Sequence, residues 1–249
     1  MVDIHLAYLA PPCQGDNQVP YNNIIALNEH AAILHYTVLE TDAPSEHRTF
    51  LIDAGASVHG YAADITRTYT TDTGEFAAIV KGVDELTITL ANQLTPNTSY
   101  VDIHEQAHAG VAQILHDAGI VNLPAHEIVA KGITKTFFPH GIGHMLGLQV
   151  HDVAGHVNDD YGTPNPAPAE HPFLRCTRNI EARHVYTIEP GVYFIDSLLA
   201  KLQSTDNAIY INWDKIAELS PFGGVRVEDN IIVHPTHIEN MSRDAGLNS

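Results

Sequence analysis

The sequence has few cysteines, few basic residues and no long apolar run, and each shortage excludes a class of protein. Cys13 and Cys176 are the only cysteines among 249 residues, too few for a disulfide framework, so a reduced, cytoplasmic protein is expected. Neither cysteine lies in a CxxC pair, which argues against a structural zinc site. No run approaches the roughly 18 apolar residues of a membrane span, and the first residues carry no basic segment typical of a secretory signal.

Basic residues number 12 against 30 acidic residues, which gives a formal charge of −18. A chain this acidic repels the phosphates of nucleic acids and anionic membranes, so we expect neither as a partner. Solubility accounts for most of the carboxylates, but a concentrated subset of them would suit a cation. Hydrophobic residues make up 44% of the chain, enough for a core, and we interpret residues 1–249 as a single domain.

Strand patterns, then helix patterns, then strand patterns again predict an α+β fold. Apolar or alternating stretches predict strands, and capping residues before periodic apolar positions predict helices. The expected strands are 24–27, 31–39, 50–53, 64–70, 184–189, 208–212 and 224–233. The expected helices are 3–10, 75–94, 101–118 and 125–131, and the proline-rich segment 159–172 is expected to be a long loop.

Four carboxylates and one imidazole stand out because each ends a strand pattern or lies beside glycine. They are Asp53, Asp64, His144, Glu189 and Glu228. Such an oxygen-rich set suits Mn²⁺, or Co²⁺ or Zn²⁺, better than a metal that prefers thiolates. Taken singly, each is also compatible with a turn, a cap or a surface ion pair. Asp53 and Glu189, however, end strongly apolar strands, where an unpaired carboxylate is costly and a metal would be a suitable partner.

Three histidines lie close together in the segment FFPHGIGHMLGLQVHD. They are His140, His144 and His151, separated by glycines that let the backbone approach a ligand closely. Histidine suits both metal ligation and acid–base chemistry near neutral pH. Most of the other histidines, of 17 in total, are expected on the surface or in ordinary core contacts.

As a set, the motifs resemble the pita-bread metallopeptidases, and specifically the bacterial Xaa-Pro dipeptidases (prolidases). The matching stretches are spread over nearly the whole chain: QGDNQVPYNNIIALNEHAAILHYT, FLIDAGASVHGYAADITRTYT, FFPHGIGHMLGLQVHDVAGH, PFLRCTR, YTIEPGVYFIDSLLA and PFGGVRVEDNIIV. The resemblance implies a curved antiparallel sheet with helices packed outside and metals on the concave face. One departure is local: Ala182, Arg183 and His184 stand where the family usually carries Gly-Met before the glutamate motif.

The resemblance implies two Mn²⁺ ions per chain, with Co²⁺ or Zn²⁺ as alternatives, and hydrolysis of dipeptides that end in proline. The implied ligands are Asp53 of LIDAG, Asp64 of YAADITRT, His144 of HGIGH, Glu189 of TIEPG and Glu228 of RVEDN. Catalytic or substrate-facing roles are implied for His35, His140, His151, Arg226 and Glu189, and Tyr21 is expected to line the pocket.

In this interpretation Glu189 accepts a proton from water and passes it to the leaving proline nitrogen. His151 stabilises the oxyanion, and His140 and Arg226 hold the proline carboxylate or orient a metal ligand.

Several alternatives stay open at this point. Within the same fold they are a methionine aminopeptidase-like enzyme, an Xaa-Pro aminopeptidase and an organophosphate hydrolase side activity. The resemblance also implies an N-terminal domain that precedes this one and supports a homodimer in similar dipeptidases; it is missing from these 249 residues. A truncated, inactive metal-binding domain is therefore a further alternative. A binding module without catalysis is disfavoured, because all five implied ligands are present.

Overall fold

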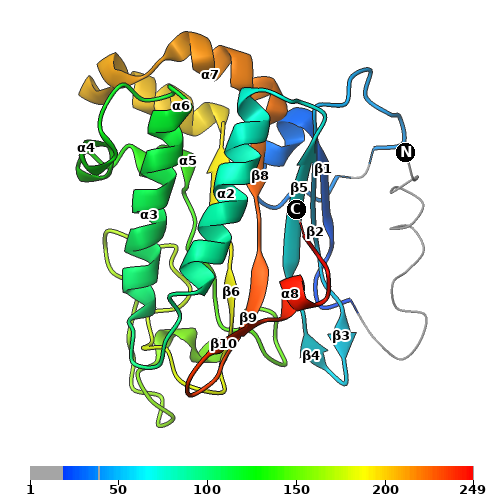
Figure 1. Cartoon of the computed structure of the whole chain (residues 1–249), viewed down its shortest axis with the longest axis vertical. Helices are drawn as coiled ribbons and strands as arrows, with labels where there is room; N and C mark the ends of the chain where they lie inside the picture. The colour runs from blue at the N-terminus through cyan, green and yellow to red at the C-terminus, as the bar shows by residue number, and fades with distance from the viewer. Residues whose placement is uncertain (1–18, 39, 249) are drawn as a thin grey trace.

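A computed structural model describes residues 19–38 and 40–248, and Figure 1 shows its arrangement. The helix expected at 3–10 and Cys13 lie outside the described residues. The described chain combines antiparallel strands with helices packed against them, which agrees with the predicted α+β class. In Figure 1 the long helices α2 and α3 run beside one another across the strands of the second half of the chain.

The first sheet comes from the N-terminal third of the described chain. Its strands β1 (Ile24–Leu27), β2 (Thr49–Ala54) and β5 (Ile65–Thr70) pair antiparallel in the order β1-β2-β5. The register places Asp53 opposite Thr66, so residues at the end of β2 and the start of β5 are neighbours. A two-stranded hairpin, β3 (Ser57–Val58) with β4 (Tyr61–Ala62), connects these two strands.

The second set of strands comes from the C-terminal third. Strands β6 (Val185–Ile188), β9 (Asp229–Val233) and β10 (Ile238–Asn240) form a sheet in the order β10-β9-β6. Strands β7 (Gly191–Tyr193) and β8 (Gly224–Arg226) form a separate antiparallel pair. Only two residues separate β6 from β7, and only two separate β8 from β9. The flanking strands therefore hold Glu189 and Glu228, which lie in these two breaks, at fixed positions.

Side chains join the two sets of strands edge to edge. The hydroxyl of Thr68 on β5 donates to the carbonyl of Arg226 on β8, at 2.8 Å, and accepts from the backbone N–H of Arg226, at 3.1 Å. The backbone N–H of Glu228 donates to the carbonyl of Thr66, at 3.0 Å. The end of β2, the start of β5 and the β8–β9 break therefore meet at one place.

Helix α2 (Glu75–Ala91) packs over this seam against β5 and β8, and helix α3 (Tyr100–Asp117) packs beside α2. The carboxylate of Asp72 accepts hydrogen bonds from the N–H groups of Phe76 and Ala77, and Ser99 accepts from Val101, so both helix starts are capped. Apolar side chains at helical spacing are fully buried, and each one larger than alanine contributes about 1.5–3 kcal/mol by leaving water. On the two helices these are Phe76, Ile79, Val83, Leu90, Ile103, Ala107, Val111 and Leu115.

Shorter elements complete the chain. The helices are α4 (Ala125–Ala130), α5 (Thr134–Phe137), α6 (Asp196–Gln203), α7 (Trp213–Leu219) and α8 (Met241–Asp244). The 3₁₀ turns are η1 (Asn28–Ala32), η2 (Val153–His156), η3 (Asp206–Tyr210) and η4 (Ser220–Phe222). Residues 159–172 form an irregular loop, as predicted. Among the described residues no helix is both long enough and apolar enough to cross a membrane.

Three strand predictions need correction. The strand expected at 31–39 is wrong, because η1 begins at Asn28, whose positive φ of 53° is fixed by side-chain hydrogen bonds to Glu46 and Arg48. The strand expected at 208–212 is also wrong, since most of it forms the turn η3, which the hydroxyl of Thr205 caps. The single strand expected at 224–233 is two strands, because the backbone at Glu228 turns to bond the first sheet.

Candidate metal centre

The five predicted metal ligands converge from five separate segments. Asp53 lies on β2, Asp64 precedes β5, Glu189 follows β6, Glu228 lies in the β8–β9 break, and His144 comes from the glycine-rich segment. Their ligand atoms form overlapping groups within 4.8 Å: Asp53 with Asp64 and Glu228, His144 with Glu189 and Glu228, and Asp64 with His144 and His151. We call Asp53, Asp64, His144, Glu189 and Glu228 the carboxylate centre.

Burial and mutual repulsion dominate the electrostatics of this centre. Burial, reinforced by the carboxylates of Asp64, Glu189 and Asp53, raises the pKa of Glu228 well above its usual range. Burial likewise raises the pKa of Glu189 to about 7, although the positive charges of His144 and Arg226 oppose the shift. Four carboxylates around so small a space are poorly compensated by one guanidinium, and divalent cations bound by these oxygens would compensate them. The donor set therefore fits a divalent metal.

His144 presents one ring nitrogen to the carboxylates and anchors the other. Its Nδ1 lies 2.9 Å from the carbonyl oxygen of Met145, to which it donates, while Nε2 lies 3.5 Å from Asp64 and 3.7 Å from Glu189. Burial alone would lower the pKa of His144, but the hydrogen bond to Asp64 and the charges of Glu189 and Asp64 raise it. Anchoring Nδ1 to a carbonyl fixes the tautomer that leaves Nε2 available to a metal.

The glycine-rich segment places His144 by pairing with β6. The N–H of His144 donates to the Thr187 hydroxyl and the N–H of Thr187 donates to the His144 carbonyl, at 3.0 and 2.9 Å. Gly143 has a φ of 151°, and a Cβ there would overlap the Thr187 carbonyl and the Tyr100 hydroxyl. Only glycine allows this approach of the two backbones, which brings His144 beside the end of β6 and Glu189.

Tyr21 contacts the ligand carboxylates themselves. Its hydroxyl lies 2.7 Å from Oδ1 of Asp53 and 2.6 Å from Oδ1 of Asp64. Burial, followed by the charges of Asp53, Asp64 and Glu228, raises the pKa of Tyr21 far above its ordinary value, so the phenol stays protonated and donates. Tyr21, which was expected to line the pocket, lies between two candidate ligands, with its hydroxyl within hydrogen-bond distance of both.

Arg226 is held entirely within the protein. Its Nη2 donates to Asp53 at 2.6 Å, its Nη1 to the Tyr193 hydroxyl at 3.1 Å and its Nε to the Thr66 hydroxyl at 3.1 Å. These bonds use all three guanidinium nitrogens, and the side chain is 5% exposed. Of the two roles predicted for Arg226, the contacts favour orienting a ligand carboxylate over holding a substrate carboxylate.

His140 belongs to the same network. Its Nδ1 donates to the Gly141 carbonyl and its Nε2 accepts from the Tyr193 hydroxyl, each at 2.8 Å. Nδ1 also lies 3.8 Å from a carboxylate oxygen of Glu189. Burial, with the charge of Arg226, lowers the pKa of His140 to about 3, so the ring is neutral. Tyr193 therefore links His140 to Arg226 through one hydroxyl.

The two remaining predicted histidines lie at the edge of the centre. His151 is exposed, and its ring meets that of His144 edge-on, with 4.5 Å between the ring centroids. Burial and the neighbouring His144 lower the pKa of His151 to about 4. His35 is also exposed, and partial burial together with the charges of Arg226 and Arg175 lowers its pKa. Both rings are thus neutral and open to solvent.

Several supporting residues escaped the sequence analysis. Thr66 donates to Glu228 at 2.7 Å, and the Asn230 amide donates to the Asp64 carbonyl at 2.7 Å. Tyr193 makes the contacts given above. Alternation along 64–70 did place Thr66 on the face of Asp64, which was the available signal. For Tyr193 there was none, since its role depends on the pairing of β7 with β8.

Comparisons with known proteins show what the chain resembles in sequence. The sequence model of metallopeptidase family M24 matches residues 5–235. The chain is 64% identical to an Xaa-Pro dipeptidase of Pseudoalteromonas atlantica and 53% identical to one of Shewanella amazonensis, each over 99% of the chain. It spans 56% of the length of each of these relatives, so only about half of either protein is represented.

Solved structures give the same result for the fold. Zn-substituted Escherichia coli aminopeptidase P in complex with product has a TM-score of 0.69 at 30% identity, covering 91% of this chain and 44% of that one. Pseudomonas aeruginosa aminopeptidase PepP has a TM-score of 0.69 at 28% identity, covering 90% and 45%. The pita-bread fold predicted from the motifs is confirmed.

Proposed function

The chain belongs to metallopeptidase family M24, and from this membership and the carboxylate centre we propose that it hydrolyses dipeptides with a C-terminal proline. Membership of this family implies a divalent metal. The proposal takes its substrate class from the relatives named Xaa-Pro dipeptidase, which are longer than this chain. We therefore assign the activity to residues 1–249 as one catalytic domain, since ligand candidates come from both sets of strands.

The observation that carries the proposal is the convergence of the five candidate ligands. Residues up to 175 positions apart along the chain, Asp53 and Glu228, offer oxygen atoms within 4.8 Å of Asp64. A structural role alone would not favour so many buried carboxylates in one place, because each costs free energy unless it is paired with positive charge. Divalent cations bound by these oxygens would offset that cost, which explains why the carboxylates are gathered here.

We propose two cations per chain, with Mn²⁺ as the physiological metal and Co²⁺ or Zn²⁺ as substitutes. Three overlapping groups of ligand atoms share Asp64, His144 and Glu228, which supports more than one cation position. Oxygen donors with a single imidazole suit Mn²⁺, and the same donors accept the other two metals. When bound, the cations supply a nucleophilic water at neutral pH and polarise the scissile carbonyl.

The chain's own residues supply proton transfer and orientation. Glu189 is the proposed proton carrier, because it lies at the edge of the centre and its side chain is 17% exposed. Neutral His151 and His35, at the exposed edge, are proposed to contact the substrate. Neutral His140 packs beside Glu189, with 3.8 Å between Nδ1 and a carboxylate oxygen, and it is proposed to limit the positions open to that carboxylate. Arg226 is proposed to orient Asp53.

Xaa-Pro aminopeptidase activity is the second candidate, and the solved aminopeptidase P structures favour it. The two activities differ in whether the proline carries a free carboxylate or a further residue. Organophosphate hydrolysis stays a prediction as a side reaction of the same centre. Cytoplasmic location, a homodimer in the longer relatives and the absence of nucleic-acid partners also stay predictions, and the charge of −18 supports the last.

The test is a substrate panel assayed on chelator-treated protein with and without added Mn²⁺. The panel contains Xaa-Pro dipeptides, Xaa-Pro-Yaa tripeptides, a Met-Ala tripeptide and a diisopropyl fluorophosphate analogue. We expect Mn²⁺-dependent cleavage of the dipeptides, lost in Glu189→Gln and kept in Glu239→Gln, an exposed glutamate of β10. Preferential cleavage of the tripeptides would replace the proposal by an aminopeptidase, and Mn²⁺ binding without any cleavage would leave only a metal-binding domain.

A further inference from the structure

Three histidines outside the carboxylate centre gather between helix α3 and the proline-rich loop. His104 and His108 lie on α3 and are 2% and 4% exposed, while His171 comes from the end of the loop 159–172 and is partly exposed. One ligand nitrogen from each lies within 4.8 Å of the others. We call these three residues the histidine cluster.

The spacing of the cluster suits a metal ion. His104 and His108 are four residues apart, so a helix presents both rings on one face. Nε2 of His104 and Nδ1 of His171 share a hydrogen bond of 3.1 Å, which a bound cation would replace. This separation is close to the roughly 3.3 Å edge of a tetrahedron whose centre is 2.0–2.1 Å from each nitrogen.

Contacts around the cluster select the nitrogens that would bind. Nδ1 of His108 lies 2.9 Å from the buried hydroxyl of Thr134, and a ring that donates from Nδ1 keeps its Nε2 lone pair free. Nδ1 of His104 is buried and has no hydrogen-bond partner within the described part of the chain. Nε2 of His104 is the nitrogen that faces His171, and it is therefore the one that would bind a cation.

The rings of the cluster are neutral at physiological pH. Burial, then the neighbouring histidines, lowers the pKa of His104 to about 2, and burial and His171 lower that of His108 to about 4. Lys135 contributes to both shifts. A metal binds the deprotonated ring, so no proton has to be displaced near pH 7.

We propose that His104, His108 and His171 form a second metal site, which binds one zinc-class divalent cation (Zn²⁺, Co²⁺ or Ni²⁺) through three imidazole nitrogens. A set of three imidazoles without carboxylates prefers these borderline metals to Mn²⁺, Mg²⁺ or Ca²⁺. Partial exposure of His171 leaves room for water as the fourth ligand. We expected no structural zinc because neither cysteine lies in a CxxC pair, and this cluster revises that expectation.

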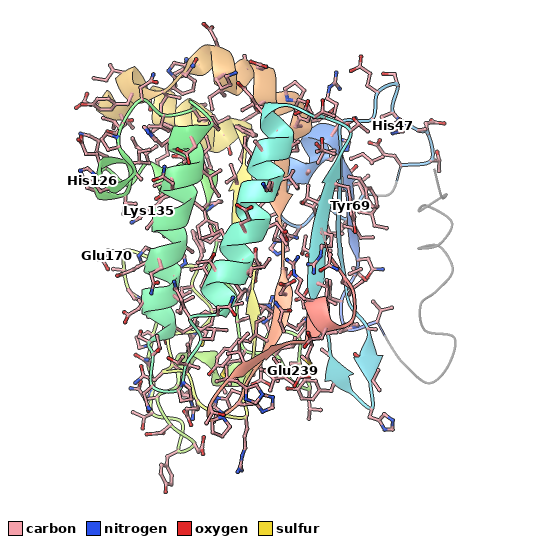
Figure 2. All side chains as sticks on the ribbon, in the orientation of Figure 1. His47, Tyr69, His126, Lys135, Glu170 and Glu239 are labelled. Carbon is pink, nitrogen blue, oxygen red and sulfur yellow. The ribbon has the colours of Figure 1, made fainter. Side chains whose placement is uncertain are left out.

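The site would fasten the loop to the outer helix layer. Lys135 already holds this region by donating to the carbonyl of Glu170, at 2.9 Å, and Figure 2 places both residues along the edge beside α3. Phe138 packs against the rings of His104 and His108, with centroids 5.6 and 5.1 Å away, and against His140 at 4.8 Å. A cation bound to the cluster would therefore restrict the motion of the loop and of Phe138, which contacts His140 beside the carboxylate centre.

The experiment counts zinc in a protein whose carboxylate centre is disabled by Asp64→Asn and Glu228→Gln. This double variant is loaded with zinc, passed through a desalting column and measured by inductively coupled plasma mass spectrometry. We expect one retained zinc per chain. Adding His108→Ala or His171→Ala should weaken zinc binding at least about tenfold. Adding His126→Ala, an exposed histidine of α4 that is labelled in Figure 2, should leave it unchanged.

Two results would overturn the proposal: no zinc in the double variant, or an alanine variant that retains as much zinc as the double variant and binds it no more weakly. Because an alanine variant can lose zinc by failing to fold, X-ray absorption at the zinc edge of the double variant gives an independent answer. Three imidazole nitrogens at about 2.0–2.1 Å support the site, and a shell dominated by oxygen contradicts it. The result does not depend on peptidase activity, so it stands or fails separately from the proposed function.

Discussion

The carboxylate centre and the histidine cluster are both buried groups of metal-binding side chains, yet burial drives them in opposite directions. Burial favours the neutral form of any group, so it raises the pKa of Glu228 and Glu189 and lowers that of His104 and His108. Neutral carboxylic acids are poor ligands, whereas neutral imidazoles are good ones. Glu228 and Glu189 thus depend on a cation to stay ionised, while the histidine cluster is already in the form that binds a cation.

The largest effect should follow from removing a carboxylate that two ligand groups share. Asp64→Asn keeps the size of the side chain but removes its charge next to His144 and Asp53. We expect Mn²⁺-dependent kcat/KM to fall by more than about 100-fold, the upper end of what losing a supporting partner costs. Steady-state assays with an Xaa-Pro dipeptide measure this. His171→Ala, which removes a cluster histidine, should keep most activity, and an equal loss there would erase the distinction between the two groups.

The next effect concerns Tyr193. Its hydroxyl hydrogen-bonds both His140 and Arg226 but none of the five candidate ligands. Tyr193→Phe removes the hydroxyl and leaves the ring buried, so Asp53 loses the support of a fixed guanidinium. We expect Mn²⁺ affinity and kcat/KM to fall about 10–100-fold. Isothermal titration with Mn²⁺, set beside the kinetics, separates positioning from folding. Tyr69→Phe, on an exposed tyrosine of β5, is the matched control, and equal affinities in both variants would refute a positioning role.

The third effect tests the histidine cluster through pH. The folded pKa of His108 is about 4 against an ordinary 6.5, so between these values the unfolded chain binds a proton that the folded chain does not. Stability must then fall as pH drops from about 6.5 towards 4, by about 1.4 kcal/mol per pH unit for one such histidine. His108→Leu cannot be protonated, and it should reduce the slope by this amount. Urea unfolding of the metal-free proteins at pH 6.5, 5.5 and 4.5 measures it, with His126→Leu as control.

Residues near one another in sequence made most of the architecture predictable. Capping residues followed by apolar periodicity located α2 and α3, and strand ends near glycine located Asp53 and Glu189. The wrong strands at 31–39 and 208–212 had apolar composition, but side-chain hydrogen bonds to the backbone favoured turns there. Composition does not reveal such bonds, because the partners of Asn28 lie on another segment.

The candidate ligands were easier to find than the residues that support them. Carboxylates at strand ends are unusual in isolation and belong to recognisable motifs, whereas Thr66 and Tyr193 are ordinary strand residues until the register of β5 and β8 is known. The histidine cluster was missed for a related reason. His171 lies 67 positions from His104, and most histidines were assigned to surface or core contacts. Only the fold brings the loop against α3.

The smallest expected effect tests the premise that repulsion within the carboxylate centre opposes folding. Because burial and three neighbouring carboxylates raise the pKa of Glu228, its stabilising contribution to the metal-free fold is lost as pH rises above its ordinary pKa. Glu228→Gln removes that cost and keeps an oxygen to accept from Thr66. We expect the chelated variant to gain about 1 kcal/mol at pH 8, roughly 2–4 °C in melting temperature.

Adding Mn²⁺ should reverse the order of stability between this variant and the natural protein. The natural centre gains binding free energy from the cation, while Glu228→Gln has lost a charged donor and gains less. Differential scanning fluorimetry of both proteins, with chelator and with Mn²⁺, gives the four melting temperatures needed. If Glu228→Gln melts lower than the natural protein even in chelator, its carboxylate stabilises the fold by itself. The carboxylate centre and the histidine cluster would then differ in the arrangement of their ligands, and not in whether burial opposes the form that binds a metal.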